Sequence, residues 1–144
     1  MQIRRAKLDD IIDIVKLEHT VFQESLGETF LYDELSLNPF ARIYIIEDED
    51  GFAGFIGVRV DDQAEMMNFA VIKEKQHRGY GTRLLQHVLN ELRLEGINQL
   101  SLEVRKSNMI AQTFYEKMGF VKSHIRKDYY KTEDAIVYIK EVTS

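Results

Sequence analysis

The chain of 144 residues contains no cysteine and no tryptophan, and it has a single proline. The absence of cysteine excludes disulfides, thiolate nucleophiles and cysteine-ligated zinc. No stretch approaches the roughly 20 consecutive apolar residues that a membrane-spanning helix needs. The first residues lead directly into patterned sequence, so we expect no signal peptide, no membrane association and a cytoplasmic location.

Positive charge is also in short supply. The chain has 19 basic and 24 acidic residues, which gives a net charge of −5. A general nucleic-acid binder takes its affinity from a basic face, so we expect no nucleic acid among the partners. An anionic ligand would need a local basic patch, which is supplied by Lys73, Lys75, His77, Arg78 and Arg83. The four histidines lack the spacing of metal ligands, so no metal site is expected.

What is present is the composition of an ordinary globular domain, with 44% hydrophobic and 30% charged residues. We expect a single domain over residues 1–144, as a monomer or a homodimer. Periodicity and turn residues predict strands near 2–5, 42–47, 52–60, 65–72, 99–105, 120–125 and 135–140. They predict helices over 8–22, about 29–37, 84–94 and between Asn108 and Gly119. Strands with interleaved helices indicate a mixed α/β sheet.

A glycine-rich turn, residues 76–82, is predicted between a strand and a helix. The first amides of a helix lack partners and the helix dipole favours an anion there, so this turn is a candidate phosphate site. Gly79 and Gly81 are expected to allow positive φ and a close ligand approach. The nucleoside-triphosphate loop is excluded because Thr82 stands where it needs lysine, and the dinucleotide fingerprint fails at Leu84. A tight turn before a surface helix is the alternative.

The pattern Gln-x-x-Gly-x-Gly at a helix start resembles the pyrophosphate loop of the GCN5-related N-acetyltransferases. Within that superfamily the chain is most similar to the ribosomal-protein-alanine N-acetyltransferases, which acetylate the N-terminal alanine of a small-subunit ribosomal protein. The resemblance is close from about residue 65 to 130. It is carried by Asn68–Val71, Gln76–Gly81, Leu102–Arg105, Ser107-Asn108, Tyr115–Phe120 and Ile125–Tyr130.

The resemblance implies a mixed, mostly antiparallel central sheet with a splayed pair of parallel strands, about 65–72 and 99–105, and flanking helices. Acetyl-CoA would lie in the gap as co-substrate, with its pantetheine arm paired to a strand edge and its pyrophosphate on the turn amides. Asn108 would bond the pantetheine or the thioester end. The implied cofactor-binding residues are Phe69, Ala70, Val71, Gln76, His77, Arg78, Gly79, Tyr80, Gly81, Thr82 and Asn108.

Two residues are candidates for catalysis. Glu103 alternates with Leu102 and Val104, so it faces away from them, and an isolated glutamate there would belong to a solvated strand face. The resemblance implies a general base, worth about 10²–10⁴ in rate. Tyr115 is either a core aromatic or, as the resemblance implies, the acid that protonates the departing thiolate or donates a hydrogen bond to it. Without cysteine, the natural mechanism is direct attack by the amine in a ternary complex.

The acceptor is an amine, and chemistry favours a protein N-terminus. An α-amine with a pKa near 7.7–8.0 is about one-third neutral at about pH 7.5, whereas a lysine near 10.4 is only about 0.1% neutral there. The resemblance also implies that Tyr129-Tyr130 lines the acceptor channel. It departs on the acceptor side, where Glu24–Glu28 replaces a Pro-Trp-Ser segment and the turn between Tyr130 and Glu133 is short.

These departures leave other acceptors open, namely lysine, a polyamine or an amino sugar. A non-catalytic acyl-CoA-binding module is the rival from another class. The presence of both Glu103 and Tyr115 argues against that module, since a sensor needs neither.

Overall fold

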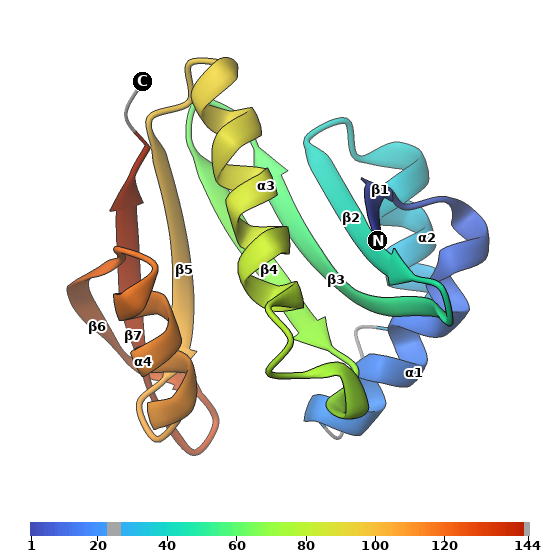
Figure 1. Ribbon diagram of the computed structural model, residues 1–144. Helices are drawn as coiled ribbons and strands as arrows, with labels where there is room; N and C mark the ends of the chain where they lie inside the picture. Colours follow the sequence, from blue (N-terminus) through green and yellow to red (C-terminus); the bar gives the residue numbers. More distant parts are fainter. Residues whose placement is uncertain (23–26, 143–144) are drawn as a thin grey trace. The chain divides into compact units, whose positions relative to one another are not determined.

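A computed structural model describes residues 1–22 and 27–142 (Figure 1). Its strands are β1 (Gln2–Arg5), β2 (Ala41–Asp48), β3 (Gly51–Val60), β4 (Ala64–Val71), β5 (Gln99–Arg105), β6 (Val121–Tyr130) and β7 (Glu133–Glu141). Its helices are α1 (Ile11–Phe22), α2 (Glu28–Leu37), α3 (Tyr80–Leu94) and α4 (Met109–Lys117), with short 3-10 turns at Leu8–Asp10 and Lys73–Lys75. No helix within the described residues is long and apolar enough to cross a membrane.

The seven strands follow the order β1-β2-β3-β4-β5-β7-β6 in one sheet. The pairings β1–β2, β2–β3, β5–β7 and β6–β7 are antiparallel. β4 and β5 pair in parallel through Ala64–Leu100 and Glu65–Ser101. This confirms the predicted α/β class with a mixed, mostly antiparallel sheet.

The contacts of the chain divide it into two compact units. The N-terminal unit comprises Met1–Asp61 and Met67–Val88, and the C-terminal unit comprises Asp62–Met66 and Leu89–Ser144. Both β4 and α3 therefore contribute to both units. A single domain over residues 1–144 stays a prediction.

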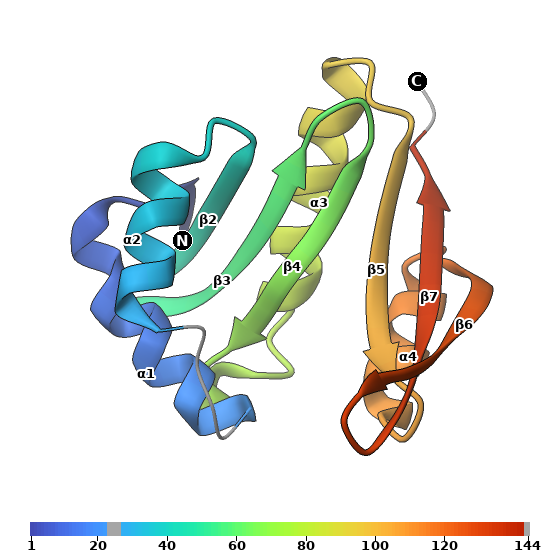
Figure 2. The same ribbon diagram turned by 180° about the vertical axis from the view of Figure 1, so that it is seen from behind.

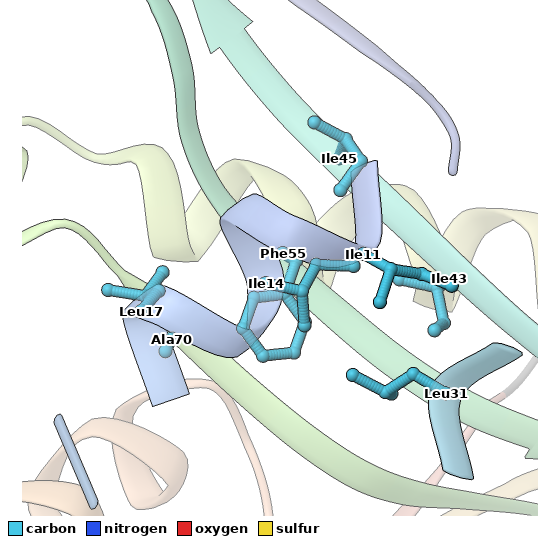
Figure 3. Packing of buried hydrophobic residues seen from close by; sticks show 8 residues of the cluster. All are labelled: Ile11, Ile14, Leu17, Leu31, Ile43, Ile45, Phe55 and Ala70. Carbon is cyan, nitrogen blue, oxygen red and sulfur yellow. The ribbon is translucent and has the colours of Figure 1, made fainter. Parts of the chain in front are cut away.

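The core of the N-terminal unit forms where α1 and α2 cover one face of β2 and β3 (Figures 1 and 2). α1 presents apolar residues three positions apart, which places them on one helix face. Figure 3 shows how the buried side chains from the four elements and from β4 meet. They are Ile11, Ile14, Leu17, Leu31, Ile43, Ile45, Phe55 and Ala70.

The core of the C-terminal unit is built on the alternation of β5. Leu100, Leu102 and Val104 are buried, whereas Glu103 is half-buried and Arg105 is exposed. The predicted facing of Glu103 away from its apolar neighbours is thus confirmed. This alternation sets the side on which the carboxylate lies.

Two element boundaries differ from the prediction in ways that matter for the site. α3 begins at Tyr80 rather than at Leu84, because the first helical turn carries the glycine-rich residues and no apolar stripe. β6 runs to Tyr130 rather than to residue 125. The residues from Arg126 to Tyr129 are all exposed, so no alternation marked this half of the strand, and backbone pairing with β7 holds it. A two-residue turn, Lys131-Thr132, connects β6 to β7.

Gly54 on β3 allows β4 to approach closely, and we expect its replacement by alanine to be costly. A Cβ there would lie 2.7 Å from the Ala70 carbonyl oxygen and 3.1 Å from the Val71 Cα, both backbone atoms that cannot rotate away. Gly54→Ala should lower the free energy of unfolding by about 1–3 kcal/mol, measured by urea denaturation.

Gly57→Ala, on the same strand, is the matched control. Its Cβ would meet the Oδ1 atom of the Asn68 side chain, whose amide nitrogen donates to Glu18 at 3.0 Å, so relief there costs a side-chain hydrogen bond and no backbone shift. An equal or larger loss for Gly57→Ala would contradict the assignment of the cost to the β4 backbone.

Candidate functional site

The glycine-rich turn takes its shape from two left-handed residues, His77 with φ 65° and Gly79 with φ 84°. The expectation that Gly81 also adopts positive φ is wrong, because α3 already begins at Tyr80 and Gly81 lies inside its first turn. Positive φ is uncommon for any residue other than glycine, so no sequence signal marked His77.

The predicted phosphate site needs backbone amides that the helix leaves without an acceptor. The Arg83 amide donates to the Gly79 carbonyl at 3.0 Å, which is the first turn-closing bond of α3. The amides of Gly81 and Thr82 precede it, so the helix itself supplies them with no acceptor. Arg78 and Arg83 are exposed beside them. The turn thus combines helix-start amides with positive charge.

One member of the predicted basic patch is neutralised. Lys75 Nζ donates to Asp48 Oδ1 at 2.8 Å, and both side chains are largely buried, with 13% and 11% exposed. The Tyr80 hydroxyl donates to the other Asp48 oxygen at 2.9 Å. The hydrogen bond from Lys75 lowers the pKa of Asp48 to about 2, with the Tyr80 bond acting in the same direction, so the carboxylate is charged at any working pH.

The expected strand edge lies on β4, next to this turn. Ala70 is buried against Gly54, and Phe69 and Val71 are half-buried. The Val71 carbonyl accepts a hydrogen bond from Gln76 Nε2 at 3.0 Å. Gln76 therefore ties the start of the turn to the end of β4.

In the C-terminal unit, Glu103 lies in an ion pair. Arg126 Nη1 on β6 donates to Glu103 Oε1 at 3.0 Å, and the exposed fractions of the two side chains are 50% and 15%. The guanidinium also lies over the Tyr129 ring, 4.5 Å from its centroid. Arg126 thus fixes the orientation of one carboxylate oxygen, and a partly exposed pair of this kind contributes only about 0–1 kcal/mol to stability.

Tyr115 on α4 is buried, and its hydroxyl donates to the Met66 sulfur at 3.6 Å. Burial raises the pKa of Tyr115, and the nearby phenol of Tyr130 adds to the rise, so the hydroxyl keeps its proton. A thioether is a weak acceptor, so breaking the hydrogen bond between the Tyr115 hydroxyl and Met66 costs little. Tyr115 is thus a protonated hydrogen-bond donor with a weak present acceptor.

Tyr130 connects these two groups electrostatically. Its pKa is raised first by burial and then by Tyr129, with Glu103 acting in the same direction and Arg105 opposing. The Arg105 guanidinium lies over its ring, 4.1 Å from the centroid. Glu103 thus raises the pKa of Tyr130, and Tyr130 in turn raises that of Tyr115.

Asn108 is the N-cap of α4, as its position in the sequence predicts. Its Oδ1 accepts from the Ala111 amide at 3.1 Å. The carbonyl oxygen of this side chain is thus engaged in holding the helix start.

The predicted site residues fall into two groups. Phe69, Ala70, Val71 and Gln76–Thr82 belong to the N-terminal unit, whereas Glu103, Asn108 and Tyr115 belong to the C-terminal unit. Sequence reasoning missed Arg126 as the partner of Glu103 and Asp48 as the anchor of the turn. The segment Glu24–Leu26, where the chain departs from the ribosomal-protein enzymes, lies outside the described residues. Over residues 1–22 and 27–142, no group of three or more His, Cys, Asp or Glu could hold a metal ion.

Comparison with known proteins identifies a matching protein family and similar enzymes. The sequence model of the acetyltransferase (GNAT) family matches residues 8–120. The ribosomal protein bS18-alanine N-acetyltransferase of Escherichia coli is 36% identical over 120 residues, which cover 81% of this chain and 74% of that enzyme. A Bacillus subtilis protein provisionally named for the same activity is 33% identical over 138 residues, covering 94% and 91%.

A solved structure agrees with these relatives. The crystal structure of the Escherichia coli ribosomal-protein-S18-alanine N-acetyltransferase superposes with a TM-score of 0.90 at 28% identity, covering 99% of this chain and 94% of that one. The match extends over nearly the whole of both chains.

Proposed function

This chain belongs to the acetyltransferase (GNAT) family, and from that membership we propose that it transfers the acetyl group of acetyl-CoA to the α-amine of a protein N-terminus. The proposed acceptor is the N-terminal alanine of a ribosomal protein. One observation carries this choice: the named activity of the Escherichia coli enzyme, at 36% identity over 81% of this chain. With such an acceptor the place of action would be the cytoplasm.

The N-terminal unit would bind the donor. The helix-start amides of the turn, from His77 to Thr82, would take the pyrophosphate, and Arg78 would add charge. The backbone of Phe69 to Val71 would pair with the amides of the pantetheine arm. The left-handed conformations of His77 and Gly79 support this proposal, because left-handed residues in a turn are typical of backbone anion sites.

The C-terminal unit would carry the chemistry. Glu103 would accept the proton of the attacking ammonium or amine, directly or through a water. As the amine nitrogen bonds to the acetyl carbon and the carbon–sulfur bond breaks, Tyr115 would donate a hydrogen bond to the departing sulfur. The burial that keeps the Tyr115 hydroxyl protonated supports that role. Asn108 would assist at the thioester end.

The nature of the base supports an α-amine as acceptor. At about pH 7.5 an α-amine is already about one-third neutral, whereas deprotonating a lysine costs about 4 kcal/mol. Glu103 is a single carboxylate paired with an arginine, with no second acidic group among the partners described for it. Such a base suits the more weakly basic amine.

The test is thiol release from acetyl-CoA by the purified protein with three acceptors in parallel. These are a short peptide that begins with the ribosomal protein's N-terminal alanine, the same peptide with a blocked N-terminus, and a polyamine. The proposal expects turnover with the free-alanine peptide alone. Turnover with the polyamine alone would replace it by a small-amine acetyltransferase. Tight acetyl-CoA binding without turnover on any acceptor would favour the binding module.

Arg78→Ala should weaken acetyl-CoA binding about fivefold, because it removes a charge-assisted contact with phosphate. The loss should be greater at low salt than at high salt, since ions screen exposed charges. Titration calorimetry at two ionic strengths measures both effects.

Arg93→Ala is the control for Arg78, because it removes an exposed arginine from the last turn of α3, at the end of that helix away from the glycine-rich turn. Its acetyl-CoA affinity should equal that of the unaltered protein. An affinity unchanged by Arg78→Ala would remove Arg78 from the site.

A further inference from the structure

Asp48, the last residue of β2, makes more contacts than its place in an acidic hairpin tip predicts. The run from Glu47 to Asp50 is expected to be solvated, yet only 11% of the Asp48 side chain is exposed. One of its oxygens accepts from Lys75 Nζ at 2.8 Å and from the Asp50 amide at 2.9 Å. The other accepts from the Tyr80 hydroxyl at 2.9 Å. The expectation of a solvated side chain is therefore wrong for Asp48.

The two side chains that donate to Asp48 flank the left-handed part of the glycine-rich turn. Lys75 immediately precedes Gln76, and Tyr80 immediately follows Gly79. One carboxylate thus joins both ends of the segment Gln76–Gly79. Inside that segment His77 and Gly79 hold left-handed conformations, and for His77 this conformation is unfavourable without support.

We propose that Asp48 is a positioning residue for the cofactor: it holds the segment Gln76–Gly79 in the conformation that binds the pyrophosphate of acetyl-CoA. This inference rests on the proposed function. Asp48 acts through Lys75 and Tyr80 and does not itself touch the phosphates.

The charges explain how an acidic group can serve an anion site. A lone carboxylate beside the turn would repel phosphate, but the Lys75 ammonium at 2.8 Å cancels its charge. Lys75 is in turn occupied, so the exposed Arg78 is left as a cation of the turn. Both members of the Asp48–Lys75 pair are nearly buried, and loss of one would leave the other charge without its partner.

The test compares two acetyl donors, acetyl-CoA and S-acetyl-pantetheine, which lacks every phosphate. Asp48→Asn should weaken CoA binding about 10- to 100-fold by calorimetry, as expected for the loss of hydrogen bonds to a charged group. The turnover number at saturating acetyl-CoA should stay within about twofold, and so should the rate with S-acetyl-pantetheine. Tyr80→Phe, which removes one of the bonds, should cause a smaller loss in the same direction.

The chain offers a closely matched control in Asp10. This carboxylate lies in the same unit, its side chain is 12% exposed, and it pairs with Arg4 at 2.8 Å. Asp10→Asn removes a buried ion pair of the same kind at another place, so it should lower stability but leave CoA affinity unchanged. Thermal unfolding of both variants shows the stability cost that they share.

Two results would overturn the positioning role. One is a CoA affinity that Asp48→Asn leaves unchanged, and the other is an equal loss of rate with both donors. The proposed function fails on different evidence. An unaltered protein that binds CoA but acetylates no acceptor would contradict that function. The CoA affinities of the variants would still test the role of Asp48.

Discussion

Glu103→Gln is expected to lower turnover by about 10²–10⁴-fold while leaving acetyl-CoA affinity nearly unchanged. The amide keeps the size of the side chain and can still accept a hydrogen bond from Arg126, which now contacts the carboxylate at 3.0 Å. It cannot accept the proton of the attacking amine. Steady-state kinetics with an N-terminal alanine peptide, together with calorimetry for CoA, separate the two effects.

Glu133→Gln is the control for Glu103. It removes a carboxylate of the same unit that is 23% exposed and is engaged by Arg105 and Ser107. Its turnover should stay close to that of the unaltered protein. If turnover and CoA affinity fall in parallel in Glu103→Gln, the residue serves binding and another group must be the base.

Tyr115→Phe should lower turnover by about 10²–10³-fold, the range found when one donor to a developing negative charge is removed. The ring and its edge contacts with Phe114 and Phe120, at centroid distances of 5.3 and 5.6 Å, are kept. The only bond described for the hydroxyl is to the weak acceptor Met66, so the stability should change little. Kinetics and thermal unfolding of the same preparation test both statements.

The pH dependence of the rate should show no alkaline fall that deprotonation of Tyr115 would cause. Burial, and after it the charge of Tyr130, raises the pKa of Tyr115 above its ordinary value near 10. The group therefore keeps its proton throughout the alkaline range in which the acceptor amine becomes neutral. The rate of the unaltered protein should rise to a plateau as the amine loses its proton, without a fall below about pH 10.

Tyr138→Phe is the matched control for Tyr115. Tyr138 is fully buried in the same unit, and its hydroxyl donates to Glu116 at 2.6 Å. Its loss should lower stability by about 1–3 kcal/mol and leave turnover unchanged, since the bond is to a charged group outside the site. Full activity in Tyr115→Phe would reduce Tyr115 to a packing residue.

Sequence periodicity predicted most elements because burial imposes it. The alternation of Leu100, Leu102 and Val104 placed β5 and also fixed the face of Glu103. The Asn108 cap was visible for the same kind of reason, since its side chain acts on an amide three residues away. Features that depend on neighbours in sequence were therefore open to prediction.

Features that depend on distant neighbours were not. Arg126 meets Glu103 only because β7 lies between β6 and β5, and nothing in either strand specifies that order. In the sequence, Asp48 is one of four consecutive acidic residues with nothing to distinguish it. Its contacts are with Lys75 and Tyr80, which lie 27 and 32 positions away. His77 takes its left-handed conformation inside a turn that these contacts hold.

The most direct test of the central claim is the position of the acetyl group on a peptide that begins with alanine and carries one internal lysine. After incubation with acetyl-CoA and the purified protein, tandem mass spectrometry locates the added group. The account predicts acetylation of the N-terminal α-amine and an unmodified lysine. Acetylation of the lysine, or an unmodified peptide under conditions in which a polyamine is acetylated, would contradict it.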